Sequence, residues 1–360
     1  MSTNVNVAII GCGGIANGKH LPSLKKLQQV NLIAFCDRDI EKAKLAAAEY
    51  GEADAAVYTD YKELLQNSSI DVVHVCTPNN AHAEISIAAL EAGKHVMCEK
   101  PMAKTSQEAK AMLDAAERTG KKLTIGYQNR FRQDSQYLHH VCKRGDLGEV
   151  YYAKAHAIRR RAVPTWGVFL DEEKQGGGPL IDIGTHALDL ALWMMNNYEP
   201  KSVMGTTFHK LGKKANAANA WGSWDPEKFT VEDSAFGFIT MKNGATIVLE
   251  SSWALNSLDV DEAKCSLSGT EGGADMKDGL RINGEEFGKL YTTNVELSNS
   301  GVAFYEGDTE NDADLEARLW IESIVNDTEP VVKPNEALVV TQILEAIYES
   351  AKTGKAVYFE

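Results

Sequence analysis

The stretch "VAIIGCGGIANGKHLPSL", residues 7–24, joins an apolar run to a cluster of glycines and then to a sequence typical of a helix. Its Gly11, Gly13 and Ala16 match the pattern G-x-G-x-x-G/A, which binds a pyrophosphate where a strand turns into a helix. Gly11 permits the sharp turn, Gly13 lets backbone N–H groups approach phosphates at the positive end of the helix, and Ala16 allows close helix packing. The stretch therefore predicts a dinucleotide site rather than a simple turn.

The residue that follows the next apolar run, Asp37, favours NAD over NADP. Asp37 comes directly after the run at residues 30–36, about twenty residues beyond the glycines, as the pattern requires. Its carboxylate can accept hydrogen bonds from both hydroxyls of an adenosine ribose, whereas a 2′-phosphate would meet a like charge. Arg38 argues in the other direction, because a guanidinium can stack on adenine or reach a 2′-phosphate. We therefore expect NAD, with NADP as the less favoured alternative.

Short apolar runs alternate with amphipathic stretches over the first 126 residues. Continuously apolar runs, separated by stretches long enough for helices, are typical of parallel strands that are buried on both faces. The apolar runs are residues 5–10, 30–36, 71–78, 95–101 and 122–127, and the amphipathic stretches are residues 39–51, 81–94 and 106–121. The sequence thus predicts an N-terminal Rossmann domain, a doubly wound parallel α/β sheet, over residues 1–126.

Polar residues follow one of the later runs, at the edge where an open parallel sheet binds its ligands. In "CTPNNAH", Thr77, Pro78 and Asn79 are expected to line the path of the cofactor. Asn79 or Asn80 can instead cap the next helix, and for an asparagine at this place capping is at least as common as ligand contact. His82 falls in the first turn of that helix, where a structural role is more common than a catalytic one.

The motif "CEKP" follows the next run and places a carboxylate beside an ammonium. Glu99 and Lys100, next to Pro101, lie where a nicotinamide is expected, and a partly buried lysine changes its pKa readily. The alternative is a surface ion pair. Because an X-Pro bond has only a small trans preference, we also predict a cis peptide between Lys100 and Pro101. The residues expected to contact the cofactor are Gly11, Gly13, Gly14, Ile15, Ala16, Asp37, Arg38, Thr77, Pro78, Asn79, His82, Glu99, Lys100 and Gln128.

In "GGGPLIDIGTHALDLALW", residues 176–193, glycines and a proline precede an apolar-periodic run, as at the start of a helix. Asp182 and His186 are four residues apart and so share a helix face, with Asp189 one near-turn further along. Gly184 costs about 1 kcal/mol relative to alanine in a helix, which indicates that something approaches the backbone there. A histidine with a carboxylate partner is the base that alcohol oxidation requires; the alternative is an exposed helix face with a weak Asp–His contact.

These motifs together resemble the Gfo/Idh/MocA oxidoreductases, the family of glucose–fructose oxidoreductase and inositol dehydrogenase. The resemblance rests on G-x-G-x-x-A from Gly11, "TPNNAH", "EKP" from Glu99 and "DIGTHALD", and it covers nearly the whole chain. It implies that Lys100, Asp182 and His186 are catalytic. It also implies hydride transfer between a nicotinamide and a secondary alcohol or ketone of a sugar or cyclitol, and a second domain whose large, mostly antiparallel sheet commonly forms the contact of an oligomer.

Residues 127–360 are expected to form this C-terminal α+β domain, which binds the substrate and assembles a homodimer or homotetramer. Long or alternating strand patterns begin at residue 149, and Asn243-Gly244 between two apolar runs predicts a hairpin. The amphipathic helices expected near the C-terminus are residues 312–327 and 335–354.

Two further residues are expected to contact the substrate together with Asp182 and His186. Arg159 begins an arginine triplet at the end of a predicted strand, where successive side chains alternate between faces, so at least one of the three is solvated. Trp166 in the following loop can stack on a sugar ring, although a tryptophan there is nearly as often part of an interface or core. Residues 210–230 are irregular and are expected to move or to cover a ligand.

Composition and charge argue against several other classes of protein. A net charge of −14 disfavours a nucleic-acid partner, and neither a membrane-length apolar run nor a signal-peptide pattern is found. The six cysteines lack C-x-x-C spacing, so we expect reduced thiols in the cytoplasm, with no disulfide framework and no metal site.

Two other functions stay open on the sequence alone. One is a glycosidase of the same family that uses tightly held NAD for a transient oxidation. The other is a regulator that binds a dinucleotide without catalysis, which the complete set of Lys100, Asp182 and His186 argues against, because a sensor needs no proton relay.

Overall fold

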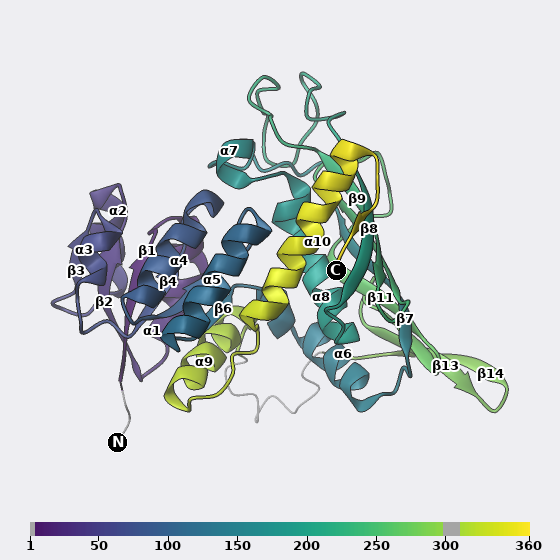
Figure 1. Cartoon of the computed structure of the whole chain (residues 1–360), viewed down its shortest axis with the longest axis horizontal. Helices are drawn as coiled ribbons and strands as arrows, with labels where there is room; N and C mark the ends of the chain where they lie inside the picture. Colours follow the sequence, from purple (N-terminus) through teal and green to yellow (C-terminus); the bar gives the residue numbers. More distant parts are fainter. Residues whose placement is uncertain (1–3, 298–309) are drawn as a thin grey trace. The chain divides into compact units, whose positions relative to one another are not determined.

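The computed structural model describes residues 4–297 and 310–360, and their contacts divide the chain into two compact units (Figure 1). The first unit runs to Gln128 and includes the later segment Glu310–Leu338, and the second holds Asn129–Thr309 and Val339–Glu360. The segment from Glu310, which the sequence placed with the C-terminal domain, packs with the first unit because its helix supplies apolar side chains to that core.

The first unit is built on a six-stranded sheet in which all the neighbouring strands are parallel. Its order, β3-β2-β1-β4-β5-β6, is that of a dinucleotide-binding sheet, so the predicted Rossmann fold is confirmed. The strands are β1 (Val5–Ile10), β2 (Val30–Cys36), β3 (Ala56–Tyr58), β4 (Val72–Val75), β5 (His95–Cys98) and β6 (Leu123–Ile125). The helices are α1 (Leu21–Lys25), α2 (Ile40–Tyr50), α3 (Tyr61–Leu65), α4 (His82–Glu91), α5 (Ser106–Thr119) and α9 (Asp312–Val325).

The central strands of this sheet are buried on both faces, which explains why they read as continuous apolar runs. The side chains of Val7 and Ala8 of β1 point to opposite faces of the sheet, and both are fully buried. All four residues of β4 are buried as well. The later helix α9 adds Trp320 and Ile321 to the same core, as its amphipathic pattern predicts.

The second unit contains a nine-stranded sheet in the order β14-β13-β12-β11-β7-β10-β9-β8-β15. Within this nine-stranded sheet, as far as the structure describes it, β7 and β10 form the only parallel pair, so the prediction of a mostly antiparallel sheet is confirmed. The strands are β7 (Val150–Ile158), β8 (Pro200–Phe208), β9 (Ser234–Met241), β10 (Thr246–Ser252), β11 (Asp261–Gly269), β12 (Gly272–Asp275), β13 (Arg281–Glu286), β14 (Lys289–Asn294) and β15 (Val357–Tyr358). The hairpin of β9 and β10 turns at Asn243, as predicted.

Helices cover one face of this sheet (Figure 1). Helix α8 packs on β7 and β11, and Ile347 of α10 lies against β8 and β9 at Gly205 and Gly237. The helices are α6 (Gln133–Arg144), α7 (Glu172–Gln175), α8 (Thr185–Met195) and α10 (Pro334–Thr353), and the division between the two units falls within α10. Over the described ranges, no helix combines the length and apolar character that a bilayer crossing needs.

Candidate active site

The glycine loop after β1 is shaped to leave room for a ligand. Gly11 has φ +95°, and a Cβ on it would lie 2.5 Å from the carbonyl oxygen of Cys76, so only glycine fits where β1 and β4 end side by side. Around Gly13 and Gly14, by contrast, no heavy atom of the described residues beyond their chain neighbours and own helix lies within 4 Å of an added Cβ. A π-helical turn, Ala16–His20, then leads into α1. The open space beside these backbone N–H groups fits a pyrophosphate.

Two neighbouring side chains also fit a dinucleotide. The Asp37 carboxylate accepts hydrogen bonds from the backbone N–H groups of Cys12 and Asp39, both at 2.9 Å, so its position beside the glycine loop is fixed. It is partly exposed, and its oxygens can accept further bonds from a ribose. Arg38 is exposed. Thr77 Oγ1 is buried without a hydrogen-bond partner among the residues that the structure describes, so a bound cofactor can satisfy it.

The loop after β4 carries the two asparagines of the predicted cofactor path. Helix α4 has Ala81 at its N-cap, and a 3₁₀ turn over Asn79–Ala81 precedes it, so Asn79 and Asn80 lie just before the cap position. Helix capping and ligand contact both stay predictions for these residues. Asn79 is buried in this turn. Pro78 before it is exposed.

The buried imidazole of His82 connects two loops of the first unit. Its Nδ1 lies 2.8 Å from the carbonyl oxygen of Pro101, and its Nε2 lies 2.9 Å from that of Thr77. Burial lowers the pKa of His82, although the two carbonyl oxygens act to raise it. These contacts favour the structural interpretation: His82 holds the "EKP" loop against the loop after β4.

Glu99 is buried, so the alternative of a surface ion pair with Lys100 is wrong. Its Oε1 accepts hydrogen bonds from Lys19 Nζ at 2.8 Å and His20 Nε2 at 2.9 Å, and its Oε2 accepts one from the backbone N–H of Lys100 at 3.1 Å. Burial acts to raise the pKa of Glu99, but the charge of Lys19 and the bond from His20 hold it well below its usual range. The ionised carboxylate therefore fixes the backbone that carries Lys100, whose bond to Pro101 is cis, as predicted.

Sequence reasoning missed the cation beneath this loop. Lys19 also lies 2.8 Å from Glu316 Oε2 of α9, so one buried ammonium bridges carboxylates from distant parts of the first unit. The available signal was the pair of polar residues, Lys19 and His20, on the helix that packs against the sheet.

Gln128, the last residue expected to contact the cofactor, starts a 3₁₀ turn after β6 and is partly buried.

Asp182 and His186 are buried, so the alternative of an exposed helix face is wrong. A helix starts after Pro179, as predicted, with Pro179 itself at the N-cap. Its first residues, Leu180–Gly184, form a π-helical turn before α8 rather than the regular α-helix that the spacing predicted. Such turns are frequent at functional sites. A Cβ on Gly184 would lie 3.0 Å from Ser251 Oγ, which confirms the prediction that something approaches the backbone there.

The Asp182 carboxylate is oriented by two groups. The indole Nε1 of the fully buried Trp253 donates a hydrogen bond to its Oδ2 at 3.0 Å, and Arg159 Nη1 lies 4.0 Å from the same oxygen. Strand β7 ends at Ile158, so Arg159 lies just beyond the strand. The predicted alternation of faces assumed that Arg159 is part of the strand, which is wrong. Its guanidinium binds both oxygens of Glu262, with Nη2 2.6 Å from Oε1.

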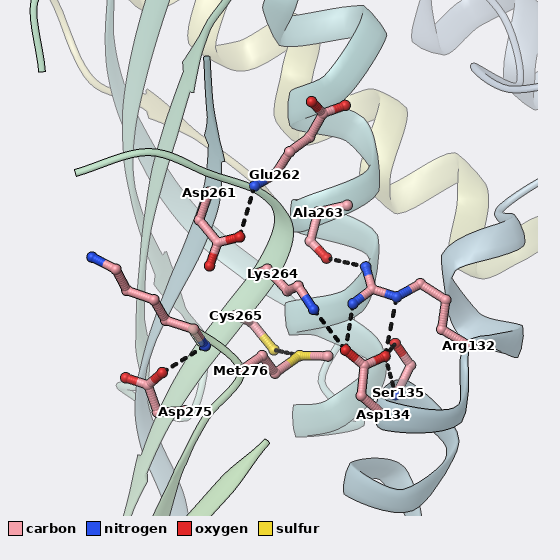
Figure 2. Close-up of polar contacts among 11 residues, drawn as sticks. Arg132, Asp134, Ser135, Asp261, Glu262, Ala263, Lys264, Cys265, Asp275 and Met276 are labelled. Atoms are coloured by element: carbon pink, nitrogen blue, oxygen red, sulfur yellow. Dashed lines mark hydrogen bonds and ion pairs between the residues drawn. The ribbon is translucent and has the colours of Figure 1, made fainter. Parts of the chain in front are cut away.

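A bulge in β11 sets the position of Glu262, and Figure 2 shows the residues that hold it. The register shifts between Glu262 and Lys264, where Ala263 has φ +53°. Arg132 donates to the carbonyl oxygen of Ala263 at 3.0 Å, and Lys264 Nζ donates to Asp134 Oδ2 at 2.7 Å. Because Ala263 and Lys264 of the bulge are tied to the start of α6, Glu262 next to them is held opposite Arg159.

Asp189, expected near the catalytic pair, has a structural partner. The guanidinium of Arg130 binds it through Nε at 2.9 Å and Nη2 at 2.6 Å, and both side chains are almost fully buried. Arg130 also lies over the ring of Trp193, 5.3 Å from its centre. This ion pair anchors α8 to the turn before α6.

Trp166 lies in the loop after β7 and is 52% exposed. Its ring contacts Trp221 edge to face, with the centroids 5.1 Å apart. Trp221 belongs to the stretch of residues 210–230, whose ordered contacts the sequence did not reveal.

The start of the helix that carries Asp182 and His186 is fixed by Glu232, which sequence reasoning also missed. This buried carboxylate accepts hydrogen bonds from the backbone N–H groups of Gly178 at 2.8 Å and Leu180 at 3.1 Å, and from the hydroxyl of Tyr348 at 2.9 Å. Burial raises the pKa of Glu232 to about 7, and these hydrogen bonds limit the rise.

The raised pKa of Glu232 predicts a pH-dependent stability. Between its usual value of 4.5 and about 7, the folded chain holds the proton while the unfolded chain releases it, so this contribution to stability is lost as pH rises through the window. Its full size is on the order of 3 kcal/mol. The melting temperature of the wild-type chain should therefore fall across this window relative to Glu232→Gln. The exposed Glu227→Gln is the matched control, and parallel curves for all three proteins would contradict the assignment.

Two family models match this chain up to residue 275, and a curated relative matches it over nearly its whole length. A family model described as "Oxidoreductase family, NAD-binding Rossmann fold" matches residues 5–127, and the "GFO/IDH/MocA C-terminal domain" matches residues 135–275. D-glucoside 3-dehydrogenase of Escherichia coli (strain K12) is 37% identical over 99% of this chain and 98% of its own.

Solved structures share the fold. The aldose-aldose oxidoreductase of Caulobacter crescentus, complexed with glycerol, superposes with a TM-score of 0.79 and 26% identity over 99% of this chain and 100% of its own. Levoglucosan dehydrogenase in complex with NADH gives a TM-score of 0.82 over 99% of both chains, and its 22% identity supports the fold alone. Because the N-terminal and C-terminal family models both match, and the D-glucoside 3-dehydrogenase is similar over nearly the whole chain, this chain belongs to the Gfo/Idh/MocA oxidoreductase family.

Proposed function

We propose that this chain is an NAD-dependent dehydrogenase that oxidises a secondary hydroxyl of a sugar or cyclitol, or reduces the corresponding ketone. The observation that carries the proposal is a buried carboxylate and imidazole, Asp182 and His186, on consecutive turns of one helix, with the carboxylate oriented by Trp253. The similarity to a D-glucoside 3-dehydrogenase makes a glucoside, with its 3-hydroxyl, the first substrate to test.

In the proposed reaction, each residue has one task. NAD would be held at the glycine loop and at Asp37, and it would supply the acceptor for the hydride. His186 takes the proton of the hydroxyl, and the ammonium of Lys100 stabilises the negative charge that develops on the oxygen. Asp182 holds the substrate hydroxyl or the imidazole in place, and its own orientation is fixed by the Trp253 indole.

Oxidation of a panel of sugars, glycosides and inositols with NAD and with NADP tests this function. We expect reduced cofactor and a keto product in equal amounts with at least one substrate class. Net hydrolysis of a glycoside without net cofactor reduction would instead identify an NAD-dependent glycosidase. Dinucleotide binding without turnover on any member of the panel would favour a regulator.

The choice between NAD and NADP depends on Asp37. Because its carboxylate is fixed beside the glycine loop, we expect NAD to bind more tightly than NADP, and Asp37→Ala to narrow the difference by about 10-fold, as expected when a charged hydrogen bond is lost. Calorimetric titration with both cofactors measures this. Arg38→Ala is the opposing variant: it should widen the difference if the guanidinium reaches a 2′-phosphate. A wild-type preference for NADP would show that Arg38 dominates.

We also propose a homodimer or homotetramer. The face of the nine-stranded sheet away from α8 exposes Met204 by 44%, Phe208 by 38% and Phe238 by 52%, and a second copy of the chain would bury these side chains. Light scattering at micromolar concentration should give the mass of an oligomer, and Phe238→Asp should lower it. A monomeric wild-type mass would contradict the proposal.

A cytoplasmic location is part of the same proposal. All six cysteines are free thiols and five of them are buried, which fits a reducing compartment. The partner that follows from the reaction is a small sugar or polyol.

A further inference from the structure

Two exposed indoles lie together in the second unit. Trp166 is 52% exposed and Trp221 is 42% exposed, and their rings meet at 70° with 5.1 Å between the centroids. Single exposed aromatic residues are common on protein surfaces and need no explanation. Two tryptophans that form one exposed corner offer a large, rigid apolar surface, which is the kind of surface that holds the apolar face of a ring.

The corner is held by a set of hydrogen bonds between two loops. Asn219 accepts a hydrogen bond from the backbone N–H of Val163 at 2.8 Å and donates through Nδ2 to the Val163 carbonyl oxygen at 3.0 Å. Thr165 Oγ1 donates to the carbonyl oxygen of Trp221 at 2.6 Å. The backbone next to each indole is therefore tied to the other loop, so the two rings are positioned before any ligand binds.

The corner lies directly beside Asp182. The guanidinium of Arg159 stacks over the ring of Trp221, 5.0 Å from its centre, and its Nη1 lies 4.0 Å from Asp182 Oδ2. On the other side, Phe169 contacts both Trp166, at 5.9 Å between centroids, and Trp253, the donor to Asp182, at 6.3 Å. The guanidinium of Arg159 thus lies next to both the aromatic corner and the Asp182 carboxylate, so a substrate bound at Asp182 can extend onto the corner.

We propose that Trp166 and Trp221 form a subsite for a second ring, so that the preferred substrate is a glycoside with a cyclic aglycone rather than a free monosaccharide. The proposal rests on the proposed function, which places the oxidised sugar at Asp182 and His186. The C–H face of a second sugar, or an aromatic aglycone, packs on the Trp166 ring. Trp221, with Arg159 over its ring, forms the second wall of the subsite. Both kinds of ring offer the same feature for recognition, a flat apolar face.

The test compares three substrates that differ only beyond the oxidised glucose: methyl glucoside, phenyl glucoside and a glucosyl-glucose disaccharide. We expect wild-type kcat/KM to be higher for one or both ring-bearing substrates than for methyl glucoside. In Trp166→Ala and Trp221→Ala, this ratio should fall by about 2- to 10-fold, the range for the loss of an aromatic contact. A gain for phenyl glucoside alone identifies an aromatic aglycone, and a gain for the disaccharide identifies a sugar.

Trp224→Phe is the matched control. Trp224 belongs to the same stretch of the chain but donates to the Gly212 carbonyl oxygen and packs on Phe229. Among the described residues its ring contacts neither Trp166 nor Trp221, so the substrate ratio should stay at the wild-type value. An unchanged ratio in Trp166→Ala and Trp221→Ala would overturn the proposal. If no substrate is oxidised, the proposed function fails, and tryptophan fluorescence decides about the subsite: quenching by a ring-bearing glycoside but not by methyl glucoside supports it, and no quenching overturns it.

Discussion

Replacing His186 with asparagine is expected to lower turnover by about 10²- to 10⁴-fold and to leave the affinity for NAD nearly unchanged. The imidazole lies on α8, buried one turn beyond Asp182, and in the proposed reaction it removes the hydroxyl proton. Asparagine keeps a polar group of similar size but cannot take a proton at neutral pH. The rate of alcohol oxidation in the wild type should rise with pH and then level off, as a histidine base requires, and the variant should lose this dependence.

Thermal melting separates this role from a packing role. If His186 only packs the helix after the glycine run, His186→Asn should lower the melting temperature, and the protein that stays folded should turn over at the wild-type rate. Single-turnover kinetics on the best substrate, measured beside the melting curve, gives both values. Wild-type turnover in a folded variant would remove the base from the mechanism.

Lys100→Met should lower turnover at least as much. The negative charge that develops on the substrate oxygen would then lack the nearby positive charge of the Lys100 ammonium. Lys100 sits on a loop that Glu99 fixes through its backbone N–H, so the ammonium is delivered from a rigid support. The double variant with His186→Asn should be little worse than either single variant, because both residues serve one proton transfer. Lys110→Met, on the exposed side of α5, is the matched control and should keep the wild-type rate. Additive losses would show that the two residues act in separate steps.

The parts of this molecule that follow local rules were predictable from the sequence. The glycine pattern requires a tight turn. The carbonyl oxygen of Cys76 explains why, because it leaves no room for a side chain at Gly11. Buried parallel strands read as apolar runs, and Gly184 marked the close approach of β10. The sequence predicted the position of Asp37 because its distance from the glycines is set by one strand-helix-strand unit.

The missed parts depend on residues that are far apart in the chain. Nothing near Glu232 in the sequence indicates that its carboxylate binds the backbone N–H of Gly178, at the start of a helix much earlier in the chain. Nor does the sequence near Lys19 indicate that its ammonium pairs with Glu316 of α9. The π-helical turn at Asp182 is set by packing on β10, which periodicity cannot reveal. Trp221 lay in a stretch that looked irregular because its order comes from the bonds of Asn219 to Val163.

Transfer of deuterium tests the central claim most directly. The chain is incubated with NAD and a glucoside that carries deuterium on its ring carbons, in ordinary water, and the reduced cofactor is analysed by mass spectrometry. Direct hydride transfer predicts one deuterium in each reduced nicotinamide, formed together with one keto-glycoside. A reduced nicotinamide without deuterium, or a hydrolysed glycoside with no reduced cofactor, would contradict the account.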